Sequence, residues 1–139
     1  MKKILKEGKS MQDHLTAIYQ SIKQLHESGG MGNFVTFVAD EEKNYYVQAT
    51  GEKEGDTIYT EAVSNNALSP AYRLNEIKLT HLKSLGWIEP KNEDGNFYKD
   101  WSINSDSDRK QVANFLLKTL EEVYNFTDND ALSANVVLE

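Results

Sequence analysis

The stretch that most constrains the fold of this chain runs from residue 85 to residue 101. It holds both tryptophans, Trp87 and Trp101, one of the two prolines, and a Gly86-Trp87 step. Glycine after an apolar helical repeat is typical of a helix end, because glycine adopts a positive φ at little cost. The proline that follows does not allow the helix to continue. The stretch therefore predicts a helix end at Gly86, then a hairpin or a split pair of strands at Trp87 and over residues 96–103.

Apolar residues at spacings of three and four predict three helices. They extend over about residues 10–27, from 69 to about 85, and from about 105 to 124. Each begins with a residue that typically caps a helix. In chain order, the expected caps are Ser10, Ser69 with Pro70 behind it, and Ser105 or Ser107. The first helix is expected to end at Gly29, Gly30 and Gly32.

Three β-rich runs, 33–39, 44–50 and 57–63, separate the first two helices. Their short connections favour antiparallel neighbours, so they predict a meander. Alternation along each run assigns the side chains to two layers. One layer is expected to hold Phe34, Val38, Val47, Ala49, Ile58 and Ala62, and the other Val35, Phe37, Tyr46, Tyr59 and Val63. A second layer with aromatic side chains is either covered or binds something.

These elements predict an α+β fold in which helices pack on an antiparallel sheet, in the order α-β-β-β-α-β-β-α. At 139 residues the chain is expected to form one domain. Its expected limits are residues 10–126, with a flexible N-terminus at 1–9. Residues 127–139 are expected to be an acidic tail or a short edge segment, because their apolar run is brief.

The net charge of -7 disfavours binding to the phosphates of nucleic acids. No apolar run is long enough to cross a bilayer, and the basic start lacks the apolar segment of a secretory signal. The absence of cysteine excludes disulfides and thiolate metal sites. We therefore expect a cytoplasmic protein that binds neither membranes nor nucleic acid. The acidity serves either solubility or a basic partner.

No catalytic, cofactor or metal pattern stands out. His14, His26 and His81 have no local arrangement that implies catalysis, and we expect them at the surface or on helix flanks. The stretch Asp128-Asn129-Asp130 starts like a calcium loop but fails at its fifth and sixth positions. The sequence thus predicts no enzyme, no cofactor and no metal ion.

The middle of the chain is rich in aromatic residues, which either fill the core or form a partner-binding surface. Tyrosine and tryptophan suit such a surface because they bury a large area and keep a hydrogen-bonding group. The candidates for partner binding are Tyr46, Tyr59, Phe97, Tyr98 and Trp101.

The spacing Gly86-Trp87-x-x-Pro90, then Asn96-Phe97-x-x-x-Trp101, then a helix with Leu116 to Tyr124, resembles a known pattern. It is similar to the chaperone-like domains grouped with class I type III secretion chaperones and YbjN-type proteins, called TY-Chap domains. The resemblance covers about residues 10–126 and implies the same order of elements. It also implies a peptide- or protein-binding role, often as a homodimer, in which an extended client segment lies on hydrophobic grooves and sheet. The motif residues Gly86, Trp87, Pro90 and Asn96 would then build a corner of the domain, as packing or as a groove wall.

Two functional hypotheses remain open at this point. The first is a non-enzymatic, chaperone-like module that holds an apolar or extended segment of a partner protein. The second is a small acidic regulatory or immunity-type protein that blocks one specific partner. An enzyme is disfavoured, and a buried carboxylate–histidine cluster in a deep pocket would revive that idea.

Overall fold

The computed structural model describes residues 2–6, 10–28, 32–51 and 56–138. Its strands are β1 (Lys2–Lys6), β2 (Phe34–Asp40), β3 (Tyr45–Gly51), β4 (Thr57–Ala62), β5 (Phe97–Ser102) and β6 (Leu132–Val137). Its α-helices are α1 (Met11–Ser28), α2 (Glu76–Leu85) and α3 (Asp106–Glu122). The predicted α+β class and order of elements are confirmed, with one further strand at each end of the chain. Gly29 and Gly30, two of the expected helix-ending glycines, lie outside the described residues.

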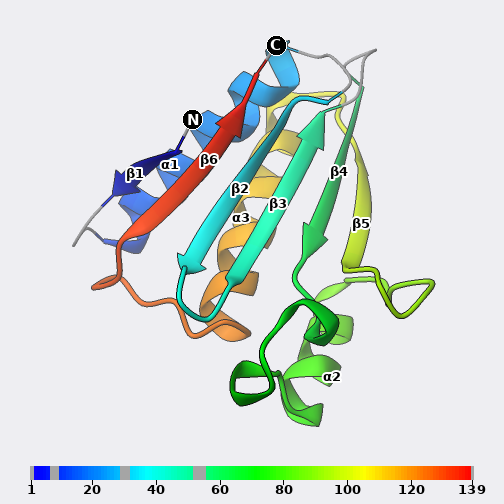
Figure 1. Ribbon diagram of the computed structural model, residues 1–139. Coiled ribbons are helices and arrows are strands. Elements are labelled where there is room, and N and C mark those ends of the chain that lie inside the picture. Colours follow the sequence, from blue (N-terminus) through cyan, green and yellow to red (C-terminus); the bar gives the residue numbers. More distant parts are fainter. Residues whose placement is uncertain (1, 7–9, 29–31, 52–55, 139) are drawn as a thin grey trace.

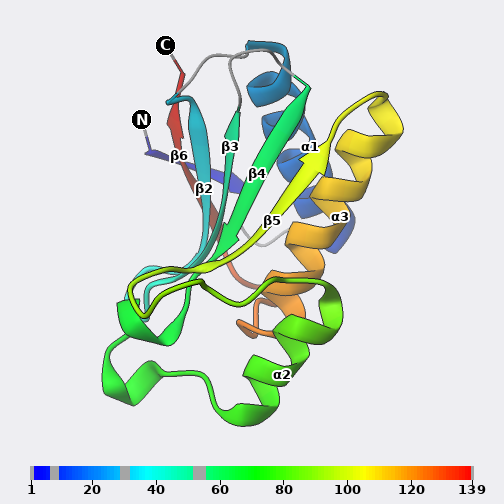
Figure 2. The same ribbon diagram turned by 90° about the vertical axis from the view of Figure 1, so that its right-hand side faces the viewer.

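The six strands form one antiparallel sheet in the order β1-β6-β2-β3-β4-β5. Helices α1 and α3 pack on one face, and α2 lies beyond the end of the sheet (Figures 1 and 2). We call the face that carries α1 and α3 the inner face and the opposite one the outer face. In both views no helix covers the outer face.

The two chain ends differ from the sequence expectation. Residues 2–6 were expected to be flexible, but they form β1, which pairs with β6. The C-terminal segment is neither a tail nor an edge strand, because β6 lies between β1 and β2. Its inner-facing residues Leu132 and Ala134 are fully buried. Strand pairing with residues over ninety positions away places this short segment in the sheet, and no local pattern indicates such a pairing.

The predicted layers of β2 are exchanged. The register pairs Val35 with Ala49 and Phe37 with Val47, and these four side chains face the helices, fully buried or nearly so. Phe34 and Val38 therefore lie on the outer face. Both sides of β2 are apolar, so alternation alone does not indicate which side faces the helices. A shift of one residue in strand register moves every side chain to the other face. Val63, which was assigned to the same layer as Tyr46 and Tyr59, is fully buried.

The second helix starts later than predicted. Ser69-Pro70 begins only a short 3₁₀-helix (Pro70–Tyr72). The backbone of Leu74 is then held by the Asn65 side chain, which accepts its N–H at 2.7 Å and donates to its carbonyl at 3.0 Å. Asn75 supplies the true cap of α2, since its side chain accepts the backbone N–H of Lys78 at 2.9 Å.

The other predicted helix limits agree with the structure. Ser10 accepts the backbone N–H of Asp13 at 3.2 Å at the start of α1. Ser105 precedes α3, and its backbone N–H donates to the Asp108 carboxylate. Gly86 ends α2 with φ of 117°, a left-handed conformation that disfavours any side chain. The chain therefore leaves α2 sharply and enters the stretch that carries both tryptophans.

Candidate functional site

Both indole rings contact one phenylalanine of α3. The Phe115 ring lies 4.8 Å from the Trp87 ring and 5.0 Å from the Trp101 ring, measured between centroids. Trp87 is buried, whereas Trp101 is partly buried and has the Lys99 ammonium 5.1 Å from its ring. We call Trp87, Trp101 and Phe115 the aromatic brace, because they join the exit of α2, strand β5 and helix α3.

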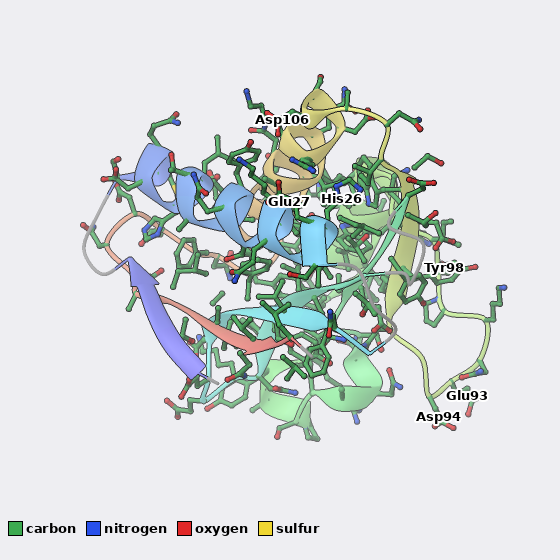
Figure 3. All side chains as sticks on the ribbon, turned by 90° about the horizontal axis from the view of Figure 1, so that it is seen from above. His26, Glu27, Glu93, Asp94, Tyr98 and Asp106 are labelled. Atoms are coloured by element: carbon green, nitrogen blue, oxygen red, sulfur yellow. The ribbon has the colours of Figure 1, made fainter. Side chains whose placement is uncertain are left out.

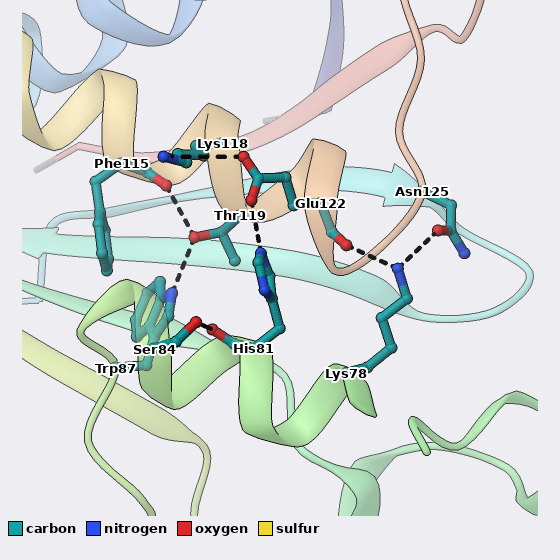
Figure 4. Close-up of polar contacts among 9 residues, drawn as sticks. All are labelled: Lys78, His81, Ser84, Trp87, Phe115, Lys118, Thr119, Glu122 and Asn125. Atoms are coloured by element: carbon teal, nitrogen blue, oxygen red, sulfur yellow. Dashed lines mark hydrogen bonds and ion pairs between the residues drawn. The ribbon is translucent and has the colours of Figure 1, made fainter. Parts of the chain in front are cut away.

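Each indole N–H donates to a buried threonine. Trp87 donates to Thr119 of α3 at 2.9 Å, and Thr119 donates to the Phe115 carbonyl at 2.8 Å (Figure 4). Trp101 donates to Thr60 of β4 at 3.0 Å, and Thr60 donates to the Lys99 carbonyl at 2.8 Å. Buried indoles need such partners, because an unpaired N–H away from water is costly. Sequence reasoning did not identify either threonine.

The remaining motif residues shape the loop before β5, which covers residues 89–96. The Asn96 side chain accepts the backbone N–H of Ser64 at 3.2 Å and donates to the Tyr46 hydroxyl at 3.2 Å. At Gly95, an added Cβ would lie 3.1 Å from the Cβ of Pro90, so glycine permits the tight closure of this loop. Ile88 forms a single antiparallel bridge with Tyr98, the split strand pair that the sequence suggested. Asn96 thus ties the loop to the segment after β4, while Pro90 packs against Gly95 within the loop.

The predicted partner-binding residues fall into two groups. Phe97 is in the core, and Trp101 belongs to the aromatic brace on the inner face. Tyr46, Tyr59 and Tyr98 all lie on the outer face, half-buried. Tyr59 of β4 and Tyr98 of β5 stack with ring centroids 6.1 Å apart and ring planes 22° apart. We call Tyr46, Tyr59 and Tyr98 the tyrosine face.

Two carboxylates accompany this tyrosine pair. Glu61 lies directly opposite Tyr98 in the register, and Asp100 lies directly opposite Tyr59. All four side chains line a groove of about 270 Å³ whose other wall is the loop before β5. Sequence reasoning missed both acids, although each stands two residues from a candidate tyrosine and so shares its face of the strand.

The groove is lined by two carboxylates, Glu61 and Asp100, and by the basic residue Lys91. Burial raises the pKa of the Glu61 carboxyl. Burial also raises the pKa of the Tyr59 hydroxyl, with further contributions from Glu61 and Asp100. Glu93 and Asp94 lie at the exposed tip of the adjacent loop, on the same side of the molecule as Tyr98 (Figure 3). The surface next to the tyrosine pair is therefore both aromatic and acidic.

The three histidines occupy different places in the structure. His14 is fully buried and packs edge-on against Phe126 at 4.9 Å, which corrects the expectation of a surface residue. Its position four residues before Ile18 places it on the buried stripe of α1. The His26 ring nitrogen Nδ1 accepts from Arg109 Nε at 2.8 Å. His81 lies 2.6 Å from the Glu122 carboxylate, a half-exposed pair that joins α2 to α3 (Figure 4).

The His81–Glu122 pair is half-exposed, with 39% of each side chain accessible, so it is not a buried carboxylate–histidine cluster. Lys78 strengthens the same junction by donating to the Glu122 carbonyl at 2.7 Å. Within the described ranges, no group of three or more His, Asp and Glu side chains is arranged to hold a metal ion. No helix in the described part of the chain combines the length and apolarity needed to span a membrane.

The fold defines this chain as a sheet-and-helix α+β domain in which the described helices leave one face of the sheet uncovered. Comparison with protein families then identifies it further. Residues 12–137 match the family described as TY-Chap3, T3SS (YopN, CesT) and YbjN peptide-binding chaperone 3. The chain belongs to this family of chaperone-like, protein-binding domains, and the resemblance drawn from the tryptophan motif is confirmed. Searches of curated proteins and of solved structures gave no match.

Proposed function

We propose that this protein is a non-enzymatic, chaperone-like module that holds an extended segment of a partner protein on the tyrosine face. The observation that carries the proposal is the outer face itself, where Tyr46, Tyr59 and Tyr98 project from strands that no described helix covers. Membership in a family described as peptide-binding chaperones supports the same role. Tyrosine is suited to it because a large ring is buried at low entropic cost while the hydroxyl still forms hydrogen bonds.

The edge strand β5 offers a second means of holding an extended segment. The N–H and the carbonyl of Tyr98 both bond to Ile88, at 3.0 and 2.9 Å, and not to β4. In an antiparallel pair, successive residues direct their backbone groups alternately toward the partner strand and away from it. The N–H and carbonyl of Asp100 therefore point away from β4, as those of Tyr98 do. A client strand that continues from Ile88 along β5 would gain these bonds by strand addition. Its alternate side chains would then extend the tyrosine face.

The aromatic brace is proposed to be structural. Phe97 and Trp101 pack on the inner face, so they would fix the position of β5 without touching the client. We also propose a cytoplasmic location, consistent with a chain that has no cysteine. We also propose a homodimer, because the class I chaperones that the motif resembles are usually dimeric.

Capture of the endogenous partner followed by hydrogen exchange tests this function. The full chain, used as bait, is expected to retain a client that slows exchange in β4 and β5. The double variant Tyr59→Ser with Tyr98→Ser should lose most of the client. The matched control is Tyr19→Ser, which removes a tyrosine from α1 in the helical layer. A captured client that protects only the helices, or equal capture by both variants, would contradict the proposal.

The acidity of the chain favours one alternative function. A net charge of -7 suits an immunity-type protein that blocks a basic toxin. A toxin-like gene beside this one, whose product binds the chain tightly and loses activity, would favour the alternative. A client held in extended form and released unfolded would favour the chaperone-like role.

A further inference from the structure

The groove beside the tyrosine pair has the chemistry of a site for a cation. Tyr59 and Glu61 project from β4, and Tyr98 and Asp100 from β5, so the four side chains form a square on the outer face. The two tyrosines occupy one diagonal and stack, and the two carboxylates occupy the other. Side chains opposite one another on paired strands are about 5 Å apart at Cβ. One group seated over the rings would therefore lie close to both carboxylates.

No basic side chain in the described part of the chain forms an ion pair with either carboxylate. Within the described residues, neither Glu61 nor Asp100 has an ion pair or a hydrogen-bonding side chain as partner. Glu61 is half-buried. A positively charged neighbour stabilises the ionised form of such a carboxylate more than that of a fully exposed one. Elsewhere on the surface, acids such as Glu89 and Glu122 do have basic partners. Both groove acids are thus free, among the described residues, to pair with a cationic ligand.

The chain itself shows that a cation fits against the Tyr98 ring of this pair. The Lys91 ammonium lies 5.6 Å from the centre of the Tyr98 ring, within the range of a cation–π contact. Lys91 is exposed on the loop that walls the groove. A client cation can therefore replace it over the ring without disturbing the core.

We propose that the groove binds an arginine side chain of the extended client segment, an inference that rests on the proposed function. The planar guanidinium would lie on the Tyr59–Tyr98 pair and donate to Glu61 on one side and Asp100 on the other. Arginine suits the site better than lysine because it stacks on aromatic rings and donates in several directions at once. The negative charge of the chain favours the same occupant.

Peptide titration of the full chain, followed by amide NMR shifts, tests this site. The probe is a short peptide in which valine and serine alternate around one central arginine. The matched peptides carry lysine, glutamine or glutamate at the centre. The arginine peptide is expected to bind about tenfold more tightly than the glutamine peptide, from one cation–π contact and two partly exposed ion pairs. The lysine peptide should fall between them, and the preference should weaken as salt is added.

Charge-matched variants separate the site from general electrostatics. The double variant Glu61→Gln with Asp100→Asn should lose the arginine preference. Glu121→Gln with Asp128→Asn removes the same charge outside the groove and should keep it. Lys91→Ala should bind the arginine peptide about two- to threefold more tightly, because it removes the competing cation. Lys23→Ala, the same charge change on α1, should have a smaller effect. A gain in affinity cannot result from misfolding.

The outcomes distinguish this inference from the function on which it rests. Equal binding of all peptides, with shifts at Tyr59 and Tyr98, would overturn the arginine site and leave the client-holding function intact. Arginine preference retained by the Glu61 and Asp100 double variant would also overturn the site. No binding of any peptide, together with no captured client, would overturn both.

Discussion

The hydrogen bond between Trp87 and Thr119 offers a sharp test of the aromatic brace. Thr119→Val keeps the shape of the side chain, because a methyl group replaces the hydroxyl, and the two residues have similar helix propensities. The substitution leaves the Trp87 indole N–H without its acceptor. Both side chains are buried, with exposed fractions of 3% for Trp87 and 0% for Thr119, so water does not replace the lost bond.

The expected cost follows from that burial. A buried donor left without a partner costs about 1–3 kcal/mol. The Phe115 carbonyl also loses the Thr119 hydroxyl, but it keeps the backbone acceptor role of an α-helix, so this loss adds little. We therefore expect the free energy of unfolding to fall by about 1–3 kcal/mol. For a chain of this size, that corresponds to a fall in Tm of roughly 3–12 °C.

Urea denaturation followed by tryptophan fluorescence and by circular dichroism measures the change. Thr16→Val on α1 is the matched control, because its hydroxyl bonds to the Gln12 carbonyl in the same way but holds no indole. The control should change stability by less than about 0.5 kcal/mol. In a double-mutant cycle, Trp87→Phe should cost about 0.5–1.5 kcal/mol less in the Thr119→Val background. Equal stability of the two valine variants, with no coupling in the cycle, would refute the brace as described here.

Three further predictions concern single side chains. His14 is fully buried, and neither of its ring nitrogens has a hydrogen-bonding partner within the described residues. His14→Leu should therefore raise the free energy of unfolding, measured by urea denaturation, by about 1 kcal/mol. A lower free energy of unfolding would show that the imidazole has a polar role. Gly86→Ala should lower the free energy of unfolding by about 1–3 kcal/mol, because φ of 117° strains any residue that carries a side chain. Thermal unfolding measures the change, and an unchanged Tm would contradict the left-handed end of α2. Burial raises the pKa of Glu61 above its usual value of 4.5, so the folded state disfavours the charged form and stability is lost as pH rises through and above 4.5. Glu61→Gln should therefore stabilise the protein at neutral pH and have little effect at pH below 4.5; a pH-independent difference would oppose this assignment.

The aromatic brace and the tyrosine face lie on opposite sides of the same strand, β5. Trp101 and Tyr98 are three residues apart on β5, so they point to opposite sides of the sheet. Trp101 anchors the strand to α3 through Phe115, which leaves Tyr98 fixed on the outer face beside Tyr59. The rigidity of one face thus supports the arrangement of the other, as expected for a site built on strands.

The local features of the fold were predictable because each depends on residues close in sequence. The periodicities of α1 and α3, the serine at the start of α1 and the positive φ of Gly86 all follow from nearest-neighbour chemistry. The start of α2 was wrong because Asn65, nine residues before Leu74, holds that backbone extended. A competing bond from outside the helix overrode the strong local signal at Pro70.

The candidate site was only partly predictable for a related reason. Sequence patterns marked the tyrosines, but they could not say that Phe97 and Trp101 face the helices while Tyr98 faces outward beside Glu61. Strand register makes that choice, and register depends on pairing between distant segments.

Thus the sequence by itself determined the α+β class, most helix limits and the tryptophan motif of the family, because these rest on local propensity and spacing. Only the tertiary structure decided that β1 and β6 complete the sheet, that Thr119 and Thr60 receive the indole N–H groups, and that Glu61 and Asp100 flank the stacked tyrosines. The reason is physical: contacts between segments far apart in the chain are fixed by packing and pairing in three dimensions, which local preferences constrain but do not specify.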